Sequence, residues 1–250
     1  MRFSSYTSAM TADAARLGQV AEDNMEVVVP TCPEWTVEDL VRHVAMVYAH
    51  KVQVLRLGRP PEPWPPESDD QAPPLTRLRT AMGELLAEFT ARGPEEIGYS
   101  WYEPDQSVGF WMRRMSHETL IHRVDAELAA KVPVNPIGAE RALDGIDELL
   151  VVCLGWASRQ WIEEDREQIA RLEERPIAVV AADRRWLLRP GPDGITVAER
   201  PDGEADVTIH GEPADVMLWL WRRVAVDAVD VDGDPELARA LYELLPTYLA

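Results

Sequence analysis

The stretch GFWMRRMSHETLIHRVDAE, Gly109–Glu127, predicts one helix that carries a carboxylate and an imidazole on an apolar face. Glu118 and His122 are four residues apart, so both side chains project from the same side of the helix. Trp111 and Met115 precede them on that face. Because burying such polar groups without a partner costs free energy, a shared divalent metal ion is a candidate partner.

A third metal ligand is needed from another helix, and His43 is the best candidate in the sequence. It lies on the inward face of a predicted helix that ends at Gly58. Thr36 is a good N-cap for that helix, and Asp39 at the third helical position completes a variant of the capping box. Two histidines and one carboxylate with an open position form a catalytic-metal arrangement in which zinc is a natural occupant.

Other interpretations of these residues stay open. His117 and Glu118 suggest a HExxH zinc protease, but the next histidine falls about 140° around a helix of ~3.6 residues per turn, which excludes that motif. A lone inward histidine such as His43 is more often a satisfied core residue, and a Glu-x-x-x-His pair is more often a simple hydrogen bond. His50 is interpreted as pocket lining or partly exposed, and His210 as structural.

Composition narrows the classes of partner. The formal net charge of −19 over 250 residues argues against nucleic acid or an anionic membrane as the main partner, since both repel an acidic surface. Cys32 and Cys153 are too far apart for a closely spaced cysteine zinc site, and we interpret both as structural. The N-terminus lacks the apolar core of a signal peptide, and no apolar run approaches the ~20 residues of a membrane span. We therefore expect a cytoplasmic protein, either a monomer or a homodimer.

The order of predicted elements indicates an α+β protein with two domains. Residues 1–172 predict an antiparallel helical bundle, and residues 173–250 predict a small α+β domain. A proline-rich, acidic stretch at 59–74 predicts a surface crossover within the bundle. The predicted helices are at about 8–22, 36–58, 75–91, 107–131, 138–164, 212–224 and 234–245, and β-like runs lie at 177–183, 184–190, 194–200 and 205–211.

Two motifs resemble a known family. CPEWTVEDLVRHV (Cys32–Val44) and FWMRRMSHETLIHRVDAE (Phe110–Glu127) resemble the mycothiol-dependent maleylpyruvate isomerase family. Two later segments resemble the second domain of proteins in this family: ADVTIHGEPADVMLWLWRR (Ala205–Arg223) and VDVDGDPELA (Val229–Ala238). The resemblance covers nearly the whole chain. It implies a DinB-like metal-binding four-helix bundle followed by a sterol-carrier-like C-terminal domain.

The resemblance also implies roles for particular residues. The family's metal ligands correspond to His43, Glu118 and His122, the same three residues that the spacing suggests. An arginine of the C-terminal domain takes part in catalysis in the isomerase, and Arg222 or Arg223 matches that region best. Its guanidinium would bind a substrate carboxylate.

The implied chemistry combines a divalent metal, zinc being the natural choice, with the thiol cofactor mycothiol. Metal coordination lowers the pKa of a thiol, so that a thiolate can attack an electrophilic carbon in an isomerase or an S-transferase. Tyr48 and Trp111 are plausible lining of a pocket that we expect between the domains. Two alternatives remain: a non-catalytic small-ligand-binding or regulatory module with a structural or absent metal, and a metal-dependent hydrolase.

Overall fold

The structure is a computed structural model that describes residues 1–64, 72–199 and 202–249. The chain divides into two compact units, Met1–Asn135 and Pro136–Ala250. Residues 65–71, which form much of the predicted proline-rich crossover, lie outside the described residues. In the part of the chain that the structure describes, no helix is both long and apolar enough to cross a membrane.

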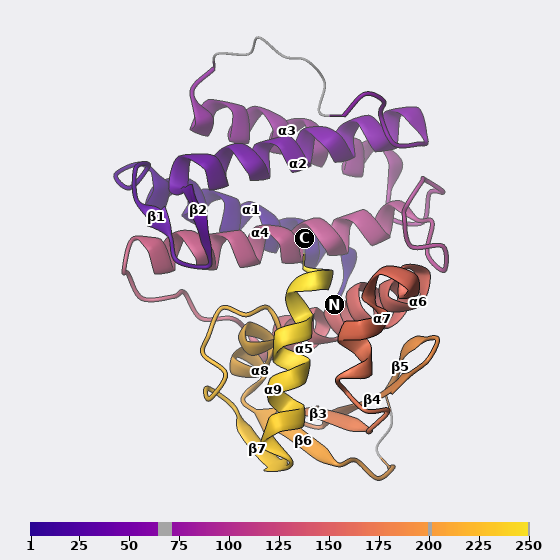
Figure 1. Cartoon of the computed structure of the whole chain (residues 1–250). Helices are drawn as coiled ribbons and strands as arrows, with labels where there is room; N and C mark the ends of the chain where they lie inside the picture. The colour runs from indigo at the N-terminus through magenta and orange to yellow at the C-terminus, as the bar shows by residue number, and fades with distance from the viewer. Residues whose placement is uncertain (65–71, 200–201, 250) are drawn as a thin grey trace. The chain divides into compact units, whose positions relative to one another are not determined.

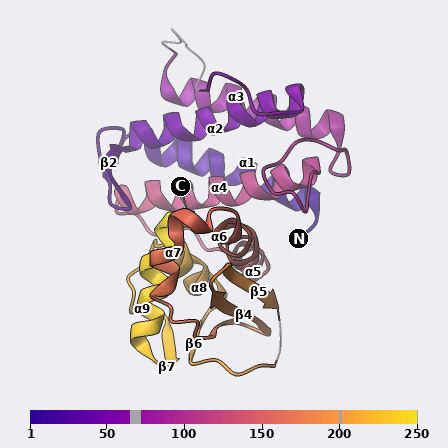
Figure 2. The same ribbon diagram turned by 45° about the vertical axis from the view of Figure 1, so that its right-hand side comes forward.

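The first unit is built from long helices and a short antiparallel hairpin. Thr36 ends the hairpin and caps the helix that follows it, as the sequence predicts. In both views α2 and α3 lie side by side, and α1 lies beside α4 (Figures 1 and 2). The elements are α1 (Phe3–Ala21), β1 (Val28–Val29), β2 (Cys32–Thr36), α2 (Val37–Leu57), α3 (Pro74–Arg92) and α4 (Val108–Ala129).

Helices α1 and α4 run in the same direction. Tyr6, near the N-terminal end of α1, has its ring 6.3 Å from that of His117, in the middle of α4, measured between centroids. Further along, Arg16 Nε donates to Glu127 Oε1 at 2.9 Å. Because the contacts advance in the same sense along both segments, the two helices are parallel.

Helix α2 runs opposite to α4. The ring of His43 lies 4.9 Å from that of His122, whereas Lys51, later in α2, lies over Trp111, earlier in α4. The antiparallel packing that the sequence predicts is therefore found between the two helices that carry the proposed ligands. This packing brings residues about 75 positions apart in the sequence to the same point of the interface.

Helix α4 is the central helix of the first unit. Nearly all of its residues are buried, including charged ones such as Asp125 and Arg123. Arg123 is 2% exposed, and its guanidinium contacts Asp13 at 3.1 Å and Glu127 at 2.5 Å. Paired and hydrogen-bonded charges of this kind can be buried, but removing one partner leaves an uncompensated charge in the core.

The second unit contains a five-stranded sheet in the order β5-β4-β3-β6-β7. Strands β3 and β6 are parallel, and the other neighbours are antiparallel. The helical region followed by a sheet-containing domain confirms the predicted two-domain α+β class. The strands are β3 (Ile177–Ala181), β4 (Arg184–Gly191), β5 (Gly194–Glu199), β6 (Val207–Gly211) and β7 (Asp230–Gly233), and the last helices are α8 (Pro213–Leu220), α9 (Pro235–Leu244) and the 3-10 turn Leu245–Tyr248.

The helical segment that the sequence analysis placed at 138–164 in the bundle belongs to the second unit. It comprises α5 (Ala139–Asp147), the π-helix Glu148–Trp156, α6 (Ala157–Gln160) and α7 (Ile162–Ala170). The boundary between compact units therefore falls at 135/136, earlier than the predicted 172/173.

Contacts with the sheet explain this position of the boundary. Trp186 Nε1 donates to Asp147 Oδ1 at 3.0 Å, and the Ile195 amide donates to Ser158 Oγ at 3.0 Å. The α5 segment also packs against α8. The sequence pattern shows that one face of this segment is apolar, but it does not say whether helices or a sheet cover that face.

Candidate metal centre

His43 is positioned by the capped start of α2. The Thr36 side chain accepts from the Asp39 amide at 3.3 Å, and Asp39 Oδ2 accepts from the Thr36 amide at 2.9 Å, which completes the capping box. This arrangement satisfies two backbone donors and fixes where the helix begins. His43 follows on the second turn, and its side chain is 25% exposed.

Glu118 and His122 lie one turn apart in the middle of α4. Ser107 caps this helix by accepting from the Phe110 amide at 3.1 Å. The side chain of Glu118 is 16% exposed and that of His122 is 10% exposed, so neither is fully solvated. The spacing of four residues places both side chains on one face of α4. That face meets α2, since the ring of His122 lies 4.9 Å from that of His43.

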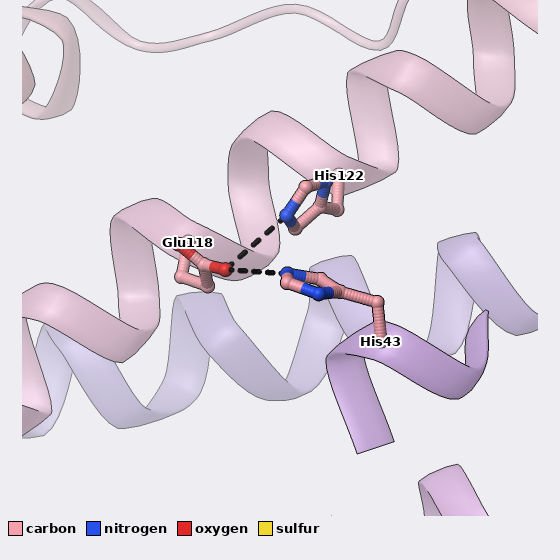
Figure 3. Close-up of side chains that lie close together, drawn as sticks. All are labelled: His43, Glu118 and His122. Atoms are coloured by element: carbon pink, nitrogen blue, oxygen red, sulfur yellow. Dashed lines mark hydrogen bonds and ion pairs between the residues drawn. The ribbon is translucent and has the colours of Figure 1, made fainter. Parts of the chain in front are cut away.

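The three side chains converge on one point, as Figure 3 shows. Glu118 Oε1 lies 3.3 Å from His43 Nε2 and 3.2 Å from His122 Nε2. The three ligand atoms all lie within 4.8 Å of one another, and we call these residues the metal triad. Two ligand atoms of a tetrahedral zinc ion are about 3.3 Å apart, so the carboxylate–imidazole separations fit a shared ion.

Arg114 holds the carboxylate of Glu118 from the side opposite the imidazoles. Its guanidinium donates to Glu118 Oε2, which leaves Oε1 directed at the two histidines. Burial alone would raise the pKa of Glu118, but His122 and Arg114 together hold it well below its usual value. The carboxylate is therefore ionised, which is the form that binds a metal.

A hydrogen-bonded chain behind His122 fixes the orientation of its ring. His122 Nδ1 lies 3.0 Å from Asp125 Oδ2, and Thr31 Oγ1 donates to Asp125 Oδ1 at 2.6 Å. Burial opposes a charge on His122, but Glu118 and Asp125 outweigh it and raise the pKa to about 9. A carboxylate on one imidazole nitrogen is the usual support for metal binding through the other nitrogen.

Trp35 of β2 forms an apolar wall beside the two imidazoles. Its ring centroid lies 4.8 Å from that of His43 and 6.5 Å from that of His122. Aromatic packing of this kind restricts the orientation of the rings. The donors are thus held by packing as well as by hydrogen bonds.

Comparisons with known proteins agree with this arrangement. Residues 7–127 match the model of the mycothiol maleylpyruvate isomerase N-terminal domain, and residues 140–240 match that of the MDMPI C-terminal domain, so that the two matches span most of the chain. The chain belongs to the mycothiol-dependent maleylpyruvate isomerase family. The two matched regions meet near the boundary between the compact units.

Solved structures of this family share the fold. A crystal structure of the mycothiol-dependent maleylpyruvate isomerase aligns with a TM-score of 0.59 at 13% identity and covers 93% of each chain. A histidine-to-alanine mutant of the mycothiol-dependent maleylpyruvate isomerase aligns with a TM-score of 0.55 at 12% identity and the same coverage. Among curated proteins, no relative matches this chain. At these identities the structures establish the fold alone.

The structure brings the three predicted ligands of this family member together, but the other predicted site residues lie elsewhere. Tyr48 is fully buried, and its hydroxyl lies 2.5 Å from Thr119 Oγ1. Trp111 is 1% exposed, and its Nε1 donates to the Tyr99 carbonyl at 2.7 Å. Both belong to the α2–α4 packing, and their contact with a cofactor stays a prediction.

Arg222 and Arg223 follow α8 in the second unit. The guanidinium carbon of Arg222 lies 3.9 Å from the ring centroid of Tyr242, and the same side chain donates to the Tyr242 carbonyl at 2.7 Å. Arg223 donates to the Trp221 carbonyl at 2.6 Å. The predicted catalytic role of either arginine stays a prediction.

The remaining histidines are placed outside the metal triad. His117 is fully buried on the face of α4 that meets Tyr6, in agreement with its exclusion on helical geometry. His50 packs against Trp64 with 4.5 Å between ring centroids. His210 of β6 lies 3.0 Å from Asp232 of β7.

Sequence reasoning missed the residues that support the triad. Asp125 follows His122 by three residues, a spacing at which two helical side chains meet, so it was detectable from the sequence. Arg114 precedes Glu118 by four residues, and the same rule applies. Thr31 and Trp35 were not detectable in this way, because only the fold brings their hairpin to α4 and α2.

Proposed function

We propose that this chain is a metal-dependent enzyme that uses mycothiol as a thiol cofactor and acts on a small electrophilic substrate. The observation that carries the proposal is the convergence of His43, Glu118 and His122 in a member of this family. A core histidine or a simple Glu–His hydrogen bond would not require a second imidazole from another helix on the same carboxylate oxygen. The donor set favours zinc among divalent metals.

Each residue of the centre has a distinct task in this proposal. His43, Glu118 and His122 would hold the ion, which would supply a Lewis acid that lowers the pKa of a thiol. Asp125 keeps His122 in the tautomer whose Nε2 faces the centre, and Arg114 keeps Glu118 ionised. Three protein ligands leave a position for an exogenous group, as in catalytic rather than structural zinc sites.

The reaction that we propose is an isomerisation or an S-transfer. Arg222 or Arg223 is proposed to bind a substrate carboxylate, since a guanidinium offers two parallel donors to such a group. The cytoplasmic location expected from the sequence is part of the same proposal.

Metal content and thermal unfolding test the proposal together. We expect protein purified without chelators to contain about one zinc per chain by elemental analysis. Mycothiol should then raise the melting temperature by mass action, whereas an analogue with alanine in place of its cysteine should not. Absence of both metal and a mycothiol effect would refute a thiol enzyme. Metal with no mycothiol effect would point instead to a structural ion or a hydrolase.

The fate of mycothiol distinguishes the two reactions. An S-transferase consumes the thiol and accumulates its adduct, whereas an isomerase returns the thiol unchanged and alters only the geometry of the substrate. Mass spectrometry of mycothiol after incubation with a panel of unsaturated and halogenated electrophiles measures this difference. The His122→Ala variant is the control for reaction without the enzyme's metal.

A further inference from the structure

Glu118 divides its two carboxylate oxygens between different partners. Oε1 lies 3.3 Å from His43 Nε2 and 3.2 Å from His122 Nε2, and Figure 3 shows this one oxygen meeting both rings. Oε2 accepts a hydrogen bond from the guanidinium of Arg114, one helical turn earlier on α4. The side chain of Arg114 is 10% exposed and that of Glu118 is 16% exposed, so water competes little for either group. One oxygen is therefore directed at the imidazoles, and the other is held by the guanidinium.

Helix α4 contains a second pair with the same spacing, Arg123 and Glu127. The oxygens of Glu127 are also divided, since Arg123 contacts Oε2 at 2.5 Å and Arg16 contacts Oε1 at 2.9 Å. Both oxygens of Glu127 thus meet guanidiniums, whereas Oε1 of Glu118 faces two imidazoles, which are metal ligands when neutral. The arginine of an Arg-x-x-x-Glu pair can therefore occupy one oxygen and leave the other directed at metal-binding groups.

The hydrogen bond to Oε2 limits how Glu118 can bind an ion. A carboxylate that coordinates through both oxygens must turn both of them toward the ion. Oε2 would then lose its hydrogen bond from Arg114, and separating a buried guanidinium from a carboxylate partner is costly. Coordination through Oε1 alone keeps that charge-assisted hydrogen bond intact.

The number of oxygens that a carboxylate offers affects which ion a site prefers. Zinc usually has four ligands in proteins, and two imidazoles, one carboxylate oxygen and one exogenous group complete that number. Manganese(II) prefers octahedral coordination by oxygen ligands. A carboxylate that offers both of its oxygens supplies one more such ligand and would favour manganese.

We propose that Arg114 is a positioning residue that restricts Glu118 to one coordinating oxygen and thereby sets the preference of the metal triad for zinc over manganese. The inference rests on the proposed function only for the presence of a divalent ion at the triad. In this role the guanidinium acts through Glu118 and is not itself a ligand of the ion.

The ratio of two metal affinities tests this role. Zinc and manganese ions carry the same charge, so removal of the Arg114 cation changes the electrostatic part of both affinities alike, and their ratio reports coordination. Protein stripped of metal by a chelator is titrated with each ion in competition with an indicator dye. We expect Arg114→Met to lower the preference for zinc over manganese about tenfold, the lower end of the effect of removing a partner of a metal ligand. An unchanged ratio in folded Arg114→Met would overturn the proposal.

Two control variants separate the hydrogen bond to Oε2 from other effects of an arginine. Arg114→Lys keeps a charged donor and should retain most of the wild-type ratio, and a lysine variant as unselective as Arg114→Met would overturn the role of the donor. Arg42→Met removes the sequence neighbour of His43, whose guanidinium contacts Glu38 at 2.7 Å on a more exposed part of α2. It should leave the ratio unchanged. An equal fall in Arg42→Met and Arg114→Met would overturn the assignment to Oε2.

Cobalt(II) in wild-type protein gives a measurement that does not depend on the folding of any variant. Four-coordinate cobalt(II) absorbs visible light much more strongly than five- or six-coordinate cobalt(II). We expect strong visible absorption in the wild type and a severalfold weaker band in Arg114→Met, in which Glu118 can offer both oxygens. Weak absorption in wild-type protein that has bound cobalt would overturn the restriction to one oxygen.

The outcomes keep this inference distinct from the proposed function. Wild-type protein that bound none of the three ions would refute both. A shifted ratio in Arg114→Met, with no effect of mycothiol on the melting temperature of zinc-loaded wild type, would refute the thiol enzyme and leave the role of Arg114 standing. A clear mycothiol effect with an unchanged ratio in Arg114→Met would refute only the role of Arg114.

Discussion

Helix α4 carries two ionic groups side by side, and they differ in how their charges are satisfied. On the side that faces α1, Asp13, Arg16, Arg123 and Glu127 form what we call the closed cluster, with two carboxylates and two guanidiniums in mutual contact. On the side that faces α2, the metal triad directs two imidazoles and one carboxylate oxygen at a single point.

This difference distinguishes a charge cluster that stabilises the fold from a cluster that can bind a metal ion. In the closed cluster every charge has a partner of opposite sign, so no external ion is needed. In the metal triad the raised pKa of His122, about 9, keeps a proton on the imidazole beside Glu118, and a metal ion would replace that proton and meet three inward lone-pair donors. His122 and Arg123 are adjacent in sequence, yet they belong to different clusters because neighbouring residues on a helix point about 100° apart.

The largest expected effect is the loss of metal when a ligand is removed. His122→Ala should reduce bound zinc to background while circular dichroism still shows the helical fold, because the side chain is one of the three proposed ligands. His117→Ala, five residues earlier and facing α1, should retain the metal. If elemental analysis found the same metal content in both variants, the ligand set would be incorrect.

Breaking the closed cluster should instead lower the free energy of unfolding. Arg123→Met removes the buried guanidinium that contacts both Asp13 and Glu127 and leaves Arg16 as the cation on Glu127, and we expect a loss of about 3–5 kcal/mol in the free energy of unfolding. Urea denaturation of metal-free protein measures this loss. Arg16→Met removes a partly exposed partner of Glu127 and should cost less. A large loss of metal affinity in folded Arg123→Met would contradict the division into two clusters.

Asp125 should affect the metal more than the fold. Asp125→Asn keeps the shape but removes the charge that supports His122 Nδ1, and loss of such a partner lowers metal affinity about 10–100-fold. Competition with a zinc-binding dye measures the affinity. Thr31→Val removes only the hydrogen bond to Asp125 and should have a smaller effect in the same direction. An unchanged affinity in both variants would show that the ring of His122 is oriented by packing alone.

The smallest effect is expected at the helix cap that precedes His43. Thr36→Ala removes the side-chain acceptor of the capping box and should cost about 1 kcal/mol of unfolding free energy. Because the start of α2 is also held by packing, metal affinity should change little. A loss of affinity comparable to that of Asp125→Asn would mean that the cap, and not the interface, positions His43.

Local patterns in the sequence were sufficient for the long helices of the first unit and for the proposed ligand pair on one helix, but they did not predict the β1–β2 hairpin or β7. The Thr36–Asp39 box places the start of α2, and the spacing of Glu118 and His122 places both on one face, because capping and helical periodicity act over a few residues. The same helical periodicity excludes His117 as a ligand of the ion that His122 would bind. Capping and helical periodicity depend on the backbone over a few residues, so they do not depend on which element the helix packs against.

Only the tertiary structure decided which surfaces meet. Apolar periodicity marks a buried face but not its partner, so the segment after Pro136 was expected in the bundle and instead packs on the sheet of the second unit. For the same reason Thr31 and Trp35 could not be foreseen as supports of the triad, nor Lys51 as a neighbour of Trp111. The convergence of His43 with α4 follows from the antiparallel packing of α2, a long-range arrangement that no local spacing encodes.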